Sequence, residues 1–494
     1  MTNFIRGVAL VFALIGPAHA QVAPAPRVAA IPPAQEILAP NGMVVAQESR
    51  AARIGVTILD RGGNAVDAAV AVGFALAVTY PRAGNIGGGG FMVIHLAKAN
   101  RDTTIDYRET APAAASAGMF LDPQGNPDPK KSRDSGLAIG VPGTVAGLAL
   151  ALEKYGSGKF SLADLLAPAI RLAQEGFPVE DDLADSLPQS RERLARWPSS
   201  AAIFLNGDAP LNEGERLLQF DLADTLRAIA ERGPSSFYRG PIAERIAAAV
   251  RAAGGVMTTD DLKNYRAIER EPVRGSYRGY DIVSMPPPSS GGVCLIEMLN
   301  ILEGYDLAKL GAGPESFHIM IEAMKRAYAD RAVFLGDPDS VKIPLAGLLS
   351  TPYAATLRAQ IGAHATPAAD IRPGKPPEAE GRNTTHFSVI DRDGNAVSNT
   401  TTLNFSYGVG LVADGTGVLL NNELDDFTAK PGAANAYGLV GFDNNLPAPN
   451  KRPLSSMAPT IVLKDGKPVL ITGSPGGSRI ITAVLQVMVN VIDF

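Results

Sequence analysis

Residues 384–403 read TTHFSVIDRDGNAVSNTTTL, and this stretch decides how the fold is interpreted. Residues 384–390 have the β-branched and aromatic composition of a strand, and residues 396–403 form a second such run that is rich in hydroxyl groups. The segment between them contains Asp393 and Gly394, a pair that strongly favours a tight turn. The sequence therefore predicts an antiparallel β-hairpin.

The predicted hairpin brings two threonine hydroxyls together at its open end. With Asp393 and Gly394 as the two turn residues, Thr384 falls opposite Leu403, and Thr402 lies one position away. Threonine pairs are also ordinary cross-strand neighbours in sheets. The hairpin alone therefore does not distinguish a catalytic pair from a structural one.

The residues before the hairpin carry the patterns of a large mixed helix and sheet fold. Short strands are predicted at residues 43–46, 91–94 and 280–285, and helices at residues 49–60, 64–78, 144–155, 221–231, 241–253, 293–302 and 314–334. Asn64 is predicted to cap the second of these helices, which is apolar on nearly all faces and is expected to be buried. Residues 340–382 lack periodicity and are rich in Pro, Ala and Gly, which predicts an exposed, mobile strap.

Four consecutive glycines, residues 87–90, suggest a nucleotide-binding loop only superficially. A dinucleotide-binding loop leads from a strand into a helix, whereas this one leads into the strand at residues 91–94. A P-loop ends in Gly-Lys-Ser or Gly-Lys-Thr, which is absent here. We expect instead that these glycines let the backbone pass close to a bulky neighbour.

The first twenty residues are typical of a secretory signal peptide. A charged start is followed by a short apolar run, and Ala18-His19-Ala20 is a small-x-small cleavage signature. Residues 21–36 form an Ala- and Pro-rich linker. No later stretch is long and charge-free enough to be a stable membrane span, so the sequence predicts a periplasmic or secreted protein.

Composition excludes several classes of protein. The 494 residues include 45 Lys and Arg against 50 Asp and Glu, and this net charge of −5 argues against a nucleic-acid partner. One cysteine and five histidines permit neither an intramolecular disulfide nor a Cys/His zinc cluster. We expect no cofactor and no metal.

Several motifs, in a fixed order, resemble the γ-glutamyltransferase (γ-glutamyltranspeptidase) family of N-terminal-nucleophile hydrolases. The resemblance spans residues 42–494, and its most specific stretches are residues 61–69, 87–91, 106–109, 384–388, 421–427, 452–457 and 473–479. It implies an α+β fold, the four-layer αββα sandwich of that superfamily. It also implies one compound domain formed by two autoprocessed subunits, in place of the three domains that the length alone suggests.

By this resemblance, the precursor cleaves its own Asn383–Thr384 bond. The products would be a large subunit at residues 37–383, preceded by the linker, and a small subunit at residues 384–494. Thr384 would attack the γ-carbonyl of glutathione or another γ-glutamyl compound, and its freed α-amine would act as the base. Water, an amino acid or a dipeptide would accept the γ-glutamyl group.

The resemblance also implies roles for the remaining site residues. Thr402 would help to activate Thr384, and Gly476 and Gly477 would supply oxyanion-hole N–H groups. A second set would hold the charged groups of the substrate: Arg108 with Ser455 and Ser456 at the α-carboxylate, and Asp426 with Asn404 and Glu423 at the α-ammonium. Glu423 departs from a common glutamine at its position. His386 is interpreted as structural, and residues 431–441, with Tyr437, match a lid loop over the glutamyl pocket.

Two alternatives stay open at this point. The related cephalosporin (glutaryl) acylases use other acyl side chains and lack the lid. Family members also continue past Phe494, and the apolar helix predicted at residues 480–493 ends there without a cap. The second alternative is therefore an inactive, truncated fragment or binding scaffold that never matures.

Overall fold

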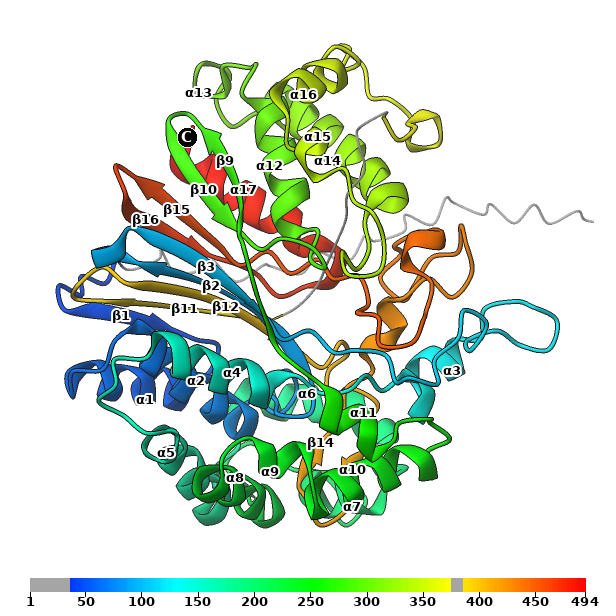
Figure 1. The fold of residues 1–494 in the computed structure, drawn as a ribbon. Helices are drawn as coiled ribbons and strands as arrows, with labels where there is room; N and C mark the ends of the chain where they lie inside the picture. The colour runs from blue at the N-terminus through cyan, green and yellow to red at the C-terminus, as the bar shows by residue number, and fades with distance from the viewer. Residues whose placement is uncertain (1–35, 375–384) are drawn as a thin grey trace, which may run out of the picture. The chain divides into compact units, whose positions relative to one another are not determined.

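The computed structural model describes residues 36–374 and 385–494, and residues 40–494 form one unit (Figure 1). Its larger sheet has the order β1-β11-β12-β2-β3-β8, and a second sheet has the order β16-β15-β10-β9; all these pairs are antiparallel. The strands are β1 (Gly42–Val45), β2 (Gly89–Leu96), β3 (Arg101–Asp106), β8 (Ile268–Arg270), β9 (Val273–Tyr277), β10 (Tyr280–Ser284), β11 (Thr385–Asp391), β12 (Ala396–Thr402), β15 (Thr460–Lys464) and β16 (Lys467–Thr472). Short pairs join β4 (Phe177–Pro178) to β7 (Arg216–Leu217), β5 (Leu205–Asn206) to β6 (Ala209–Pro210), and β13 (Val412–Ala413) to β14 (Val418–Leu419).

The seven helices predicted above are all present in the structure, together with further helices. Three of the predicted ranges agree with the structure to the residue: α1 (Ser49–Asp60), α4 (Thr144–Tyr155) and α14 (Pro314–Phe334). The remaining α-helices of the structure are α2 (Ala65–Thr79), α3 (Pro129–Arg133), α5 (Leu162–Glu175), α6 (Asp181–Ala195), α7 (Pro198–Phe204), α8 (Phe220–Arg232), α9 (Ser235–Tyr238), α10 (Pro241–Ala252), α11 (Thr259–Asn264), α12 (Gly291–Leu302), α13 (Leu307–Leu310), α15 (Leu345–Leu348), α16 (Thr351–Arg358) and α17 (Ile480–Ile492). Asn64 caps α2 as predicted, and every residue of α2 is buried.

Side-chain alternation buries both faces of both sheets. In β2, Met92 and Ile94 join the core that includes α2, whereas Phe91 and Val93 join a core between the two sheets. In β10, Val283 belongs to that inter-sheet core, whereas Ile282 packs with α12, α14 and α17. Figure 1 shows α1, α2 and α4 beside the larger sheet, and α12, α14 and α17 beside the smaller one.

The predicted hairpin is present, but its register differs by one residue from the predicted register. β11 and β12 pair with Ile390 opposite Ala396, whereas the predicted two-residue turn placed Arg392 opposite Asn395. That turn prediction is therefore wrong. Thr384, whose predicted partner rested on that register, lies outside the described residues.

Asp391 explains the longer turn. Its carboxylate accepts hydrogen bonds from the backbone N–H groups of Asp393, at 3.0 Å, and Asn395, at 2.9 Å. Gly394 adopts a φ of +84°, which fits the left-handed position of a three-residue hairpin loop. The same carboxylate accepts a hydrogen bond from the backbone N–H of Ala65 at 3.0 Å. One side chain thus joins the hairpin to the start of α2.

We expect Asp391→Ala to lower the free energy of unfolding by about 2–4 kcal/mol, because several backbone donors lose a charged acceptor. Equilibrium denaturation in urea measures this change. Asp393→Ala is the matched control, since the Asp393 side chain lies in the same turn but is exposed, and it should change stability by less than about 0.5 kcal/mol. Equal losses in the two variants would contradict the role given to Asp391.

The prediction of an exposed strap at residues 340–382 is wrong for its first half. α16 buries Tyr353, Ala354 and Leu357 in the core with α12 and α14. Only a short apolar spacing of one and three residues marks this helix, and the surrounding Pro, Ala and Gly obscured it. Residues 361–374 are exposed or half-buried as predicted, and residues 375–382 lie outside the described part.

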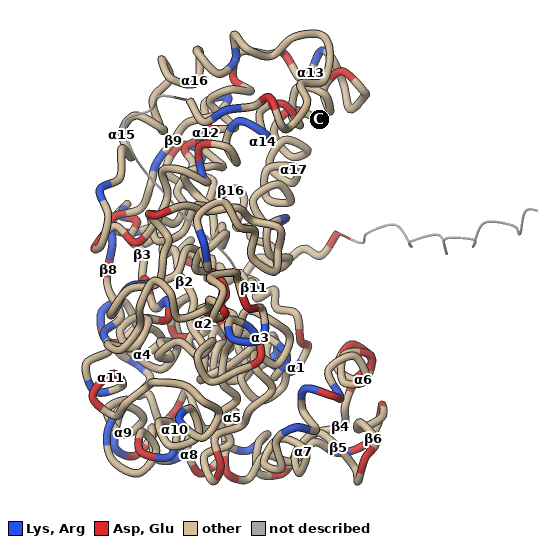
Figure 2. Tube along the Cα trace, turned by 90° about the vertical axis from the view of Figure 1, so that its right-hand side faces the viewer, with Lys and Arg blue, Asp and Glu red and all other residues tan. Residues whose placement is uncertain are grey.

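Charged residues of both signs are spread along the described part of the chain. In the view of Figure 2, Lys and Arg residues are interspersed with Asp and Glu residues along the chain. Within residues 36–374 and 385–494, no helix combines the length and the apolar character needed to cross a membrane. Cys294 is buried in α12, as the sequence predicts.

Candidate active site

The glycine run at residues 87–90 lets the chain approach the end of β12 closely. A Cβ atom on Gly88 would lie 2.1 Å from the carbonyl oxygen of Thr402, and one on Gly90 would lie 2.3 Å from that of Thr400. The predicted close approach is therefore confirmed. The side-chain amide of Asn85 also donates a hydrogen bond to the Thr402 carbonyl at 2.7 Å. These contacts fix the backbone at the last residue of β12.

A cavity of about 710 Å³ opens beside this strand end. It brings together five of the residues that the sequence assigned to a site, which arrive from three separate segments: Thr402, Asn404, Tyr437, Gly476 and Gly477. The volume lies in the range of small-molecule sites in proteins. The hairpin end, the lid segment and the loop before α17 therefore line the same cavity.

Hydrogen bonds hold the cavity wall in a defined shape. The Thr402 hydroxyl oxygen accepts a hydrogen bond from the backbone N–H of Asn404 at 2.7 Å, and Asn404 adopts a φ of +72°. The Tyr437 hydroxyl donates to the Asn404 carbonyl oxygen at 2.8 Å, so the lid segment lies against the end of the hairpin. The Tyr437 ring also packs on Gly477, where a Cβ atom would lie 2.5 Å from it.

Two glycines precede the C-terminal helix on the same wall. Gly476 and Gly477 have φ values of +128° and +59°, and Gly477–Arg479 forms a single 3₁₀ turn before α17. Backbone N–H groups at the start of a helix favour negative charge. The loop is therefore suited to stabilise an oxyanion at the cavity.

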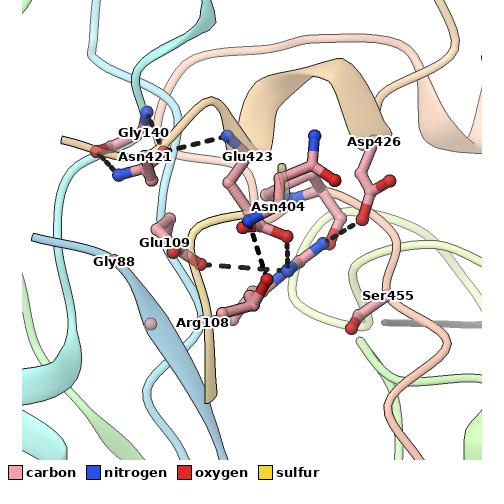
Figure 3. Close-up of polar contacts among 12 residues, drawn as sticks. Gly88, Arg108, Glu109, Gly140, Asn404, Asn421, Glu423, Asp426 and Ser455 are labelled. Atoms are coloured by element: carbon pink, nitrogen blue, oxygen red, sulfur yellow. Dashed lines mark hydrogen bonds and ion pairs between the residues drawn. The ribbon is translucent and has the colours of Figure 1, made fainter. Parts of the chain in front are cut away.

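Arg108 forms the centre of a buried charged cluster (Figure 3). Its Nη2 donates to Asp426 Oδ2 at 2.6 Å, its Nη1 donates to Glu423 Oε1, and Glu109 Oε2 lies 3.9 Å from Nη1. Its Nε donates to the carbonyl oxygen of Pro453 at 3.1 Å. The guanidinium group thus faces three carboxylates, one from the loop after β3 and two from the segment after β14.

Burial and charge oppose each other in this cluster. Burial raises the pKa of Asp426 to about 6 and that of Glu109 to about 8, although Arg108 acts in the opposite direction on both. Burial also raises the pKa of Glu423 well above its usual value. The pKa of Arg108 is lowered by burial but raised more strongly by the three carboxylates, so the guanidinium stays charged. The cluster has more acidic groups than one arginine can neutralise.

Three carboxylate oxygens of the cluster are buried without a hydrogen-bond partner within residues 36–374 and 385–494: both oxygens of Glu109 and Oε2 of Glu423. The buried Ser456 hydroxyl also makes no hydrogen bond in these ranges. Buried polar atoms are normally hydrogen-bonded, so unpaired ones call for an explanation such as a missing ligand. The two glutamates lie beside Arg108, so their unpartnered oxygens mark a place where a charged group could bind.

The structure divides the predicted substrate residues into two sets. Arg108, Glu423, Asp426, Ser455 and Ser456 are all buried, whereas Asn404 lines the open cavity. Sequence reasoning assigned Arg108 and Asp426 to opposite ends of a substrate, and the structure pairs them with each other. Arg108 and Asp426 therefore neutralise each other in this structure.

Two residues of the site were missed from the sequence. The Asn435 side chain donates to Asp426 Oδ1 at 3.2 Å, so the lid segment contacts the buried cluster as well as the cavity. Glu109 lies in the cluster beside Arg108. Adjacency to Arg108 could have indicated Glu109, but no local pattern distinguishes Asn435 from other loop amides.

His386 has the contacts of a structural side chain. Its Nδ1 lies 3.1 Å from the Thr400 hydroxyl, and its Nε2 lies 2.8 Å from the Ser388 hydroxyl. Burial lowers the pKa of His386 to about 3, so the ring is neutral near pH 7. Asn383 and Thr384, the predicted cleavage site, lie outside the described residues. In the described part of the chain, no group of three or more His, Cys, Asp or Glu side chains is arranged to hold a metal ion.

Comparison with known proteins connects these features. A family model described as gamma-glutamyltranspeptidase matches residues 51–494. The glutathione hydrolase proenzyme of Escherichia coli (strain K12) is 55% identical over 461 residues, which cover 93% of this chain and 79% of that protein.

Solved structures give the same picture. The gamma-glutamyltranspeptidase of Helicobacter pylori is 46% identical, with a TM-score of 0.67, and the match covers 69% of this chain and 97% of that one. A cephalosporin acylase from Bacillus halodurans is 31% identical, with a TM-score of 0.83, and the match covers 96% of this chain and 84% of that one.

Proposed function

This chain belongs to the gamma-glutamyltranspeptidase family, and on that premise we propose how its residues carry out the family's reaction. The chain is a γ-glutamyltransferase and glutathione hydrolase. It is made as a proenzyme, in keeping with the relatives that it matches. The donor is a γ-glutamyl compound such as glutathione, and the acceptor is water, an amino acid or a dipeptide.

The buried cluster around Arg108 is the observation that carries this proposal. A γ-glutamyl group has an α-carboxylate and an α-ammonium, and the cluster offers one guanidinium and an excess of carboxylates. On binding, Arg108 exchanges Asp426 for the substrate carboxylate, while Asp426 and Glu423 receive the ammonium. The unpartnered Ser456 hydroxyl then donates to the carboxylate, together with Ser455, and the side chain of Asn404 assists at the ammonium.

Thr384 supplies the covalent chemistry. Hydrolysis of the Asn383–Thr384 peptide bond frees its α-amine, which titrates near neutral pH and can act as a base. The Thr384 hydroxyl attacks the γ-carbonyl carbon, and its proton passes to the α-amine. The tetrahedral intermediate expels the peptide amine, which takes that proton and leaves a γ-glutamyl ester. Water or an acceptor amine then attacks the ester and loses a proton to the α-amine, and the Thr384 oxygen regains one as it leaves.

The cavity wall stabilises the intermediates of both steps. Gly476 and Gly477 donate their backbone N–H groups to the oxyanion, where one such donor is worth roughly 3–4 kcal/mol of barrier. Thr402 holds the Thr384 oxygen by a hydrogen bond from its hydroxyl. The hydrogen bond from the Asn404 N–H to the Thr402 hydroxyl oxygen leaves that hydroxyl's own proton free to donate. Tyr437 closes the pocket as part of the lid.

We also propose how the enzyme is folded, how it matures and where it is located. The two stacked sheets and their helices correspond to the four-layer αββα sandwich of N-terminal-nucleophile hydrolases. Cleavage would convert it into a heterodimer of residues 37–383 and 384–494 without separating the sheets, because β11 and β12 are inserted between β1 and β2. Residues 1–20 direct export, which places the enzyme in a periplasm or outside the cell.

The likeness to a cephalosporin acylase supports a second candidate function, hydrolysis of a glutaryl side chain. Glutaryl and γ-glutamyl groups differ only by the α-ammonium. Three carboxylates around Arg108, and a lid segment that contacts Asp426 through Asn435, favour a substrate with that ammonium. The γ-glutamyl reaction is therefore the better supported of the two.

One assay tests both candidates. We expect release of the amine from a chromogenic γ-glutamyl anilide, faster release when glycylglycine is added, and at least 100-fold lower kcat/KM for the glutaryl anilide. Rate without dipeptide measures hydrolysis, and stimulation by dipeptide measures transfer. Turnover of the glutaryl anilide alone would establish the acylase function, and no turnover of either would refute both.

A further inference from the structure

The cavity has a second feature that attracts negative charge, in addition to the glycine loop at Gly476 and Gly477. Arg82 lies in the turn after α2, where its carbonyl oxygen accepts a hydrogen bond from the Tyr407 N–H at 3.0 Å. Its Nη1 donates to Asp182 Oδ1 of α6 at 2.8 Å, and its guanidinium carbon lies 5.7 Å from the centre of the Tyr80 ring. Arg82, Asp182 and Tyr80 all line the cavity that contains Thr402.

These contacts orient the Arg82 guanidinium and leave most of its N–H donors unbonded. The hydrogen bond to Asp182 is the only one that its side chain makes within residues 36–374 and 385–494. A guanidinium has five N–H donors, so most remain available at the cavity. The side chain is 29% exposed, and it is held at one edge by Asp182 and on one face by the Tyr80 ring. Such a preorganised cation loses little entropy when it binds an anion.

The chemistry of the reaction supplies a matching anion. The buried Arg108 cluster takes the charged end of the γ-glutamyl group, so the rest of the substrate lies in the open cavity. For glutathione this remainder is a dipeptide, and its one remaining charge is the terminal carboxylate. A dipeptide acceptor carries the same carboxylate, and a planar guanidinium matches it with two parallel hydrogen bonds.

We propose that Arg82, oriented by Asp182, binds the terminal carboxylate of the peptide that leaves or accepts the γ-glutamyl group. The proposal rests on the function given above and adds the recognition of the acceptor. Arg479 is the competing anchor, since it also lines the cavity and is exposed. Arg479 makes no ion pair within the described ranges, whereas Asp182 and the Tyr80 ring hold the Arg82 side chain.

The test compares two acceptors that differ only in that carboxylate. Transfer from a γ-glutamyl anilide is measured with glycylglycine and with glycylglycinamide, for the wild type and for Arg82→Gln. We expect Arg82→Gln to raise the KM for glycylglycine about tenfold and that for glycylglycinamide less than twofold. Arg82→Lys should recover part of the loss, because it keeps the charge without the fork.

Control variants make the outcome decisive. Arg227→Gln breaks a comparable exposed pair with Asp224 on α8, outside the cavity, and should leave both KM values at the wild-type level. Equal KM changes for the two acceptors in Arg82→Gln would overturn the proposal, as would a carboxylate-dependent loss in Arg479→Gln instead. Anilide hydrolysis in water by the wild type is the separate test of the proposed function, since it needs no acceptor carboxylate.

Discussion

Thr384→Ala is expected to give a single uncleaved polypeptide without measurable γ-glutamyl transfer or hydrolysis. The variant lacks the hydroxyl that cleaves the Asn383–Thr384 bond and attacks the donor, and its residue 384 amine stays locked in a peptide bond. The loss of turnover should be at least about 10⁴-fold, as for removal of the nucleophile in other hydrolases. Denaturing electrophoresis and the γ-glutamyl anilide assay measure the two effects.

Thr384→Ser removes the methyl group of the side chain and keeps the hydroxyl, so it tests the hydroxyl alone. Because it keeps a nucleophilic oxygen, it should still cleave, more slowly than the wild type, and should keep part of the activity. The wild type should show two bands that correspond to residues 384–494 and to the remainder of the chain. Two bands from Thr384→Ala would refute self-cleavage by this residue, and a single band from the wild type would refute maturation altogether.

Local signals predicted the parts of the fold that local interactions determine. Asn64 caps α2 through its own side chain, and the continuous apolar run after it needs burial on all sides, so both are legible in the sequence. The hairpin register was misread because the Asp393-Gly394 signal is local too. The competing carboxylate of Asp391 acts on the same turn and also on Ala65, more than 300 residues away in the sequence.

The site itself was predictable only through its motifs. Thr402 and Gly476 were assigned by resemblance, and the structure places them on one cavity. Nothing in the sequence indicates that Arg108 contacts Asp426, since more than 300 residues separate them and they meet only where the loop after β3 lies against the segment after β14. Asn435 was missed for the same reason, because its role depends entirely on where the lid lies.

Replacement of Arg108 should have the second largest effect, on both activity and stability. Arg108→Gln leaves three buried carboxylates without their cation, so we expect about 3–5 kcal/mol less stability and at least 10³-fold lower kcat/KM. Arg108→Lys keeps one positive charge but loses the fork that contacts Asp426 and Glu423 together. It should lose less stability than the glutamine variant, while kcat/KM still falls about 100-fold.

A comparison of substrates separates recognition by Arg108 from its structural role. The anilide of 4-aminobutyrate keeps the ammonium and the scissile amide of the γ-glutamyl anilide but lacks the α-carboxylate. If Arg108 binds that carboxylate, the wild type should prefer the γ-glutamyl anilide by at least 100-fold, and Arg108→Lys should reduce this preference to less than tenfold. A merely structural arginine would slow both anilides equally in the variant and leave the preference unchanged. Because the ratio is measured on one folded protein at a time, lost stability cannot imitate the result that the proposal requires.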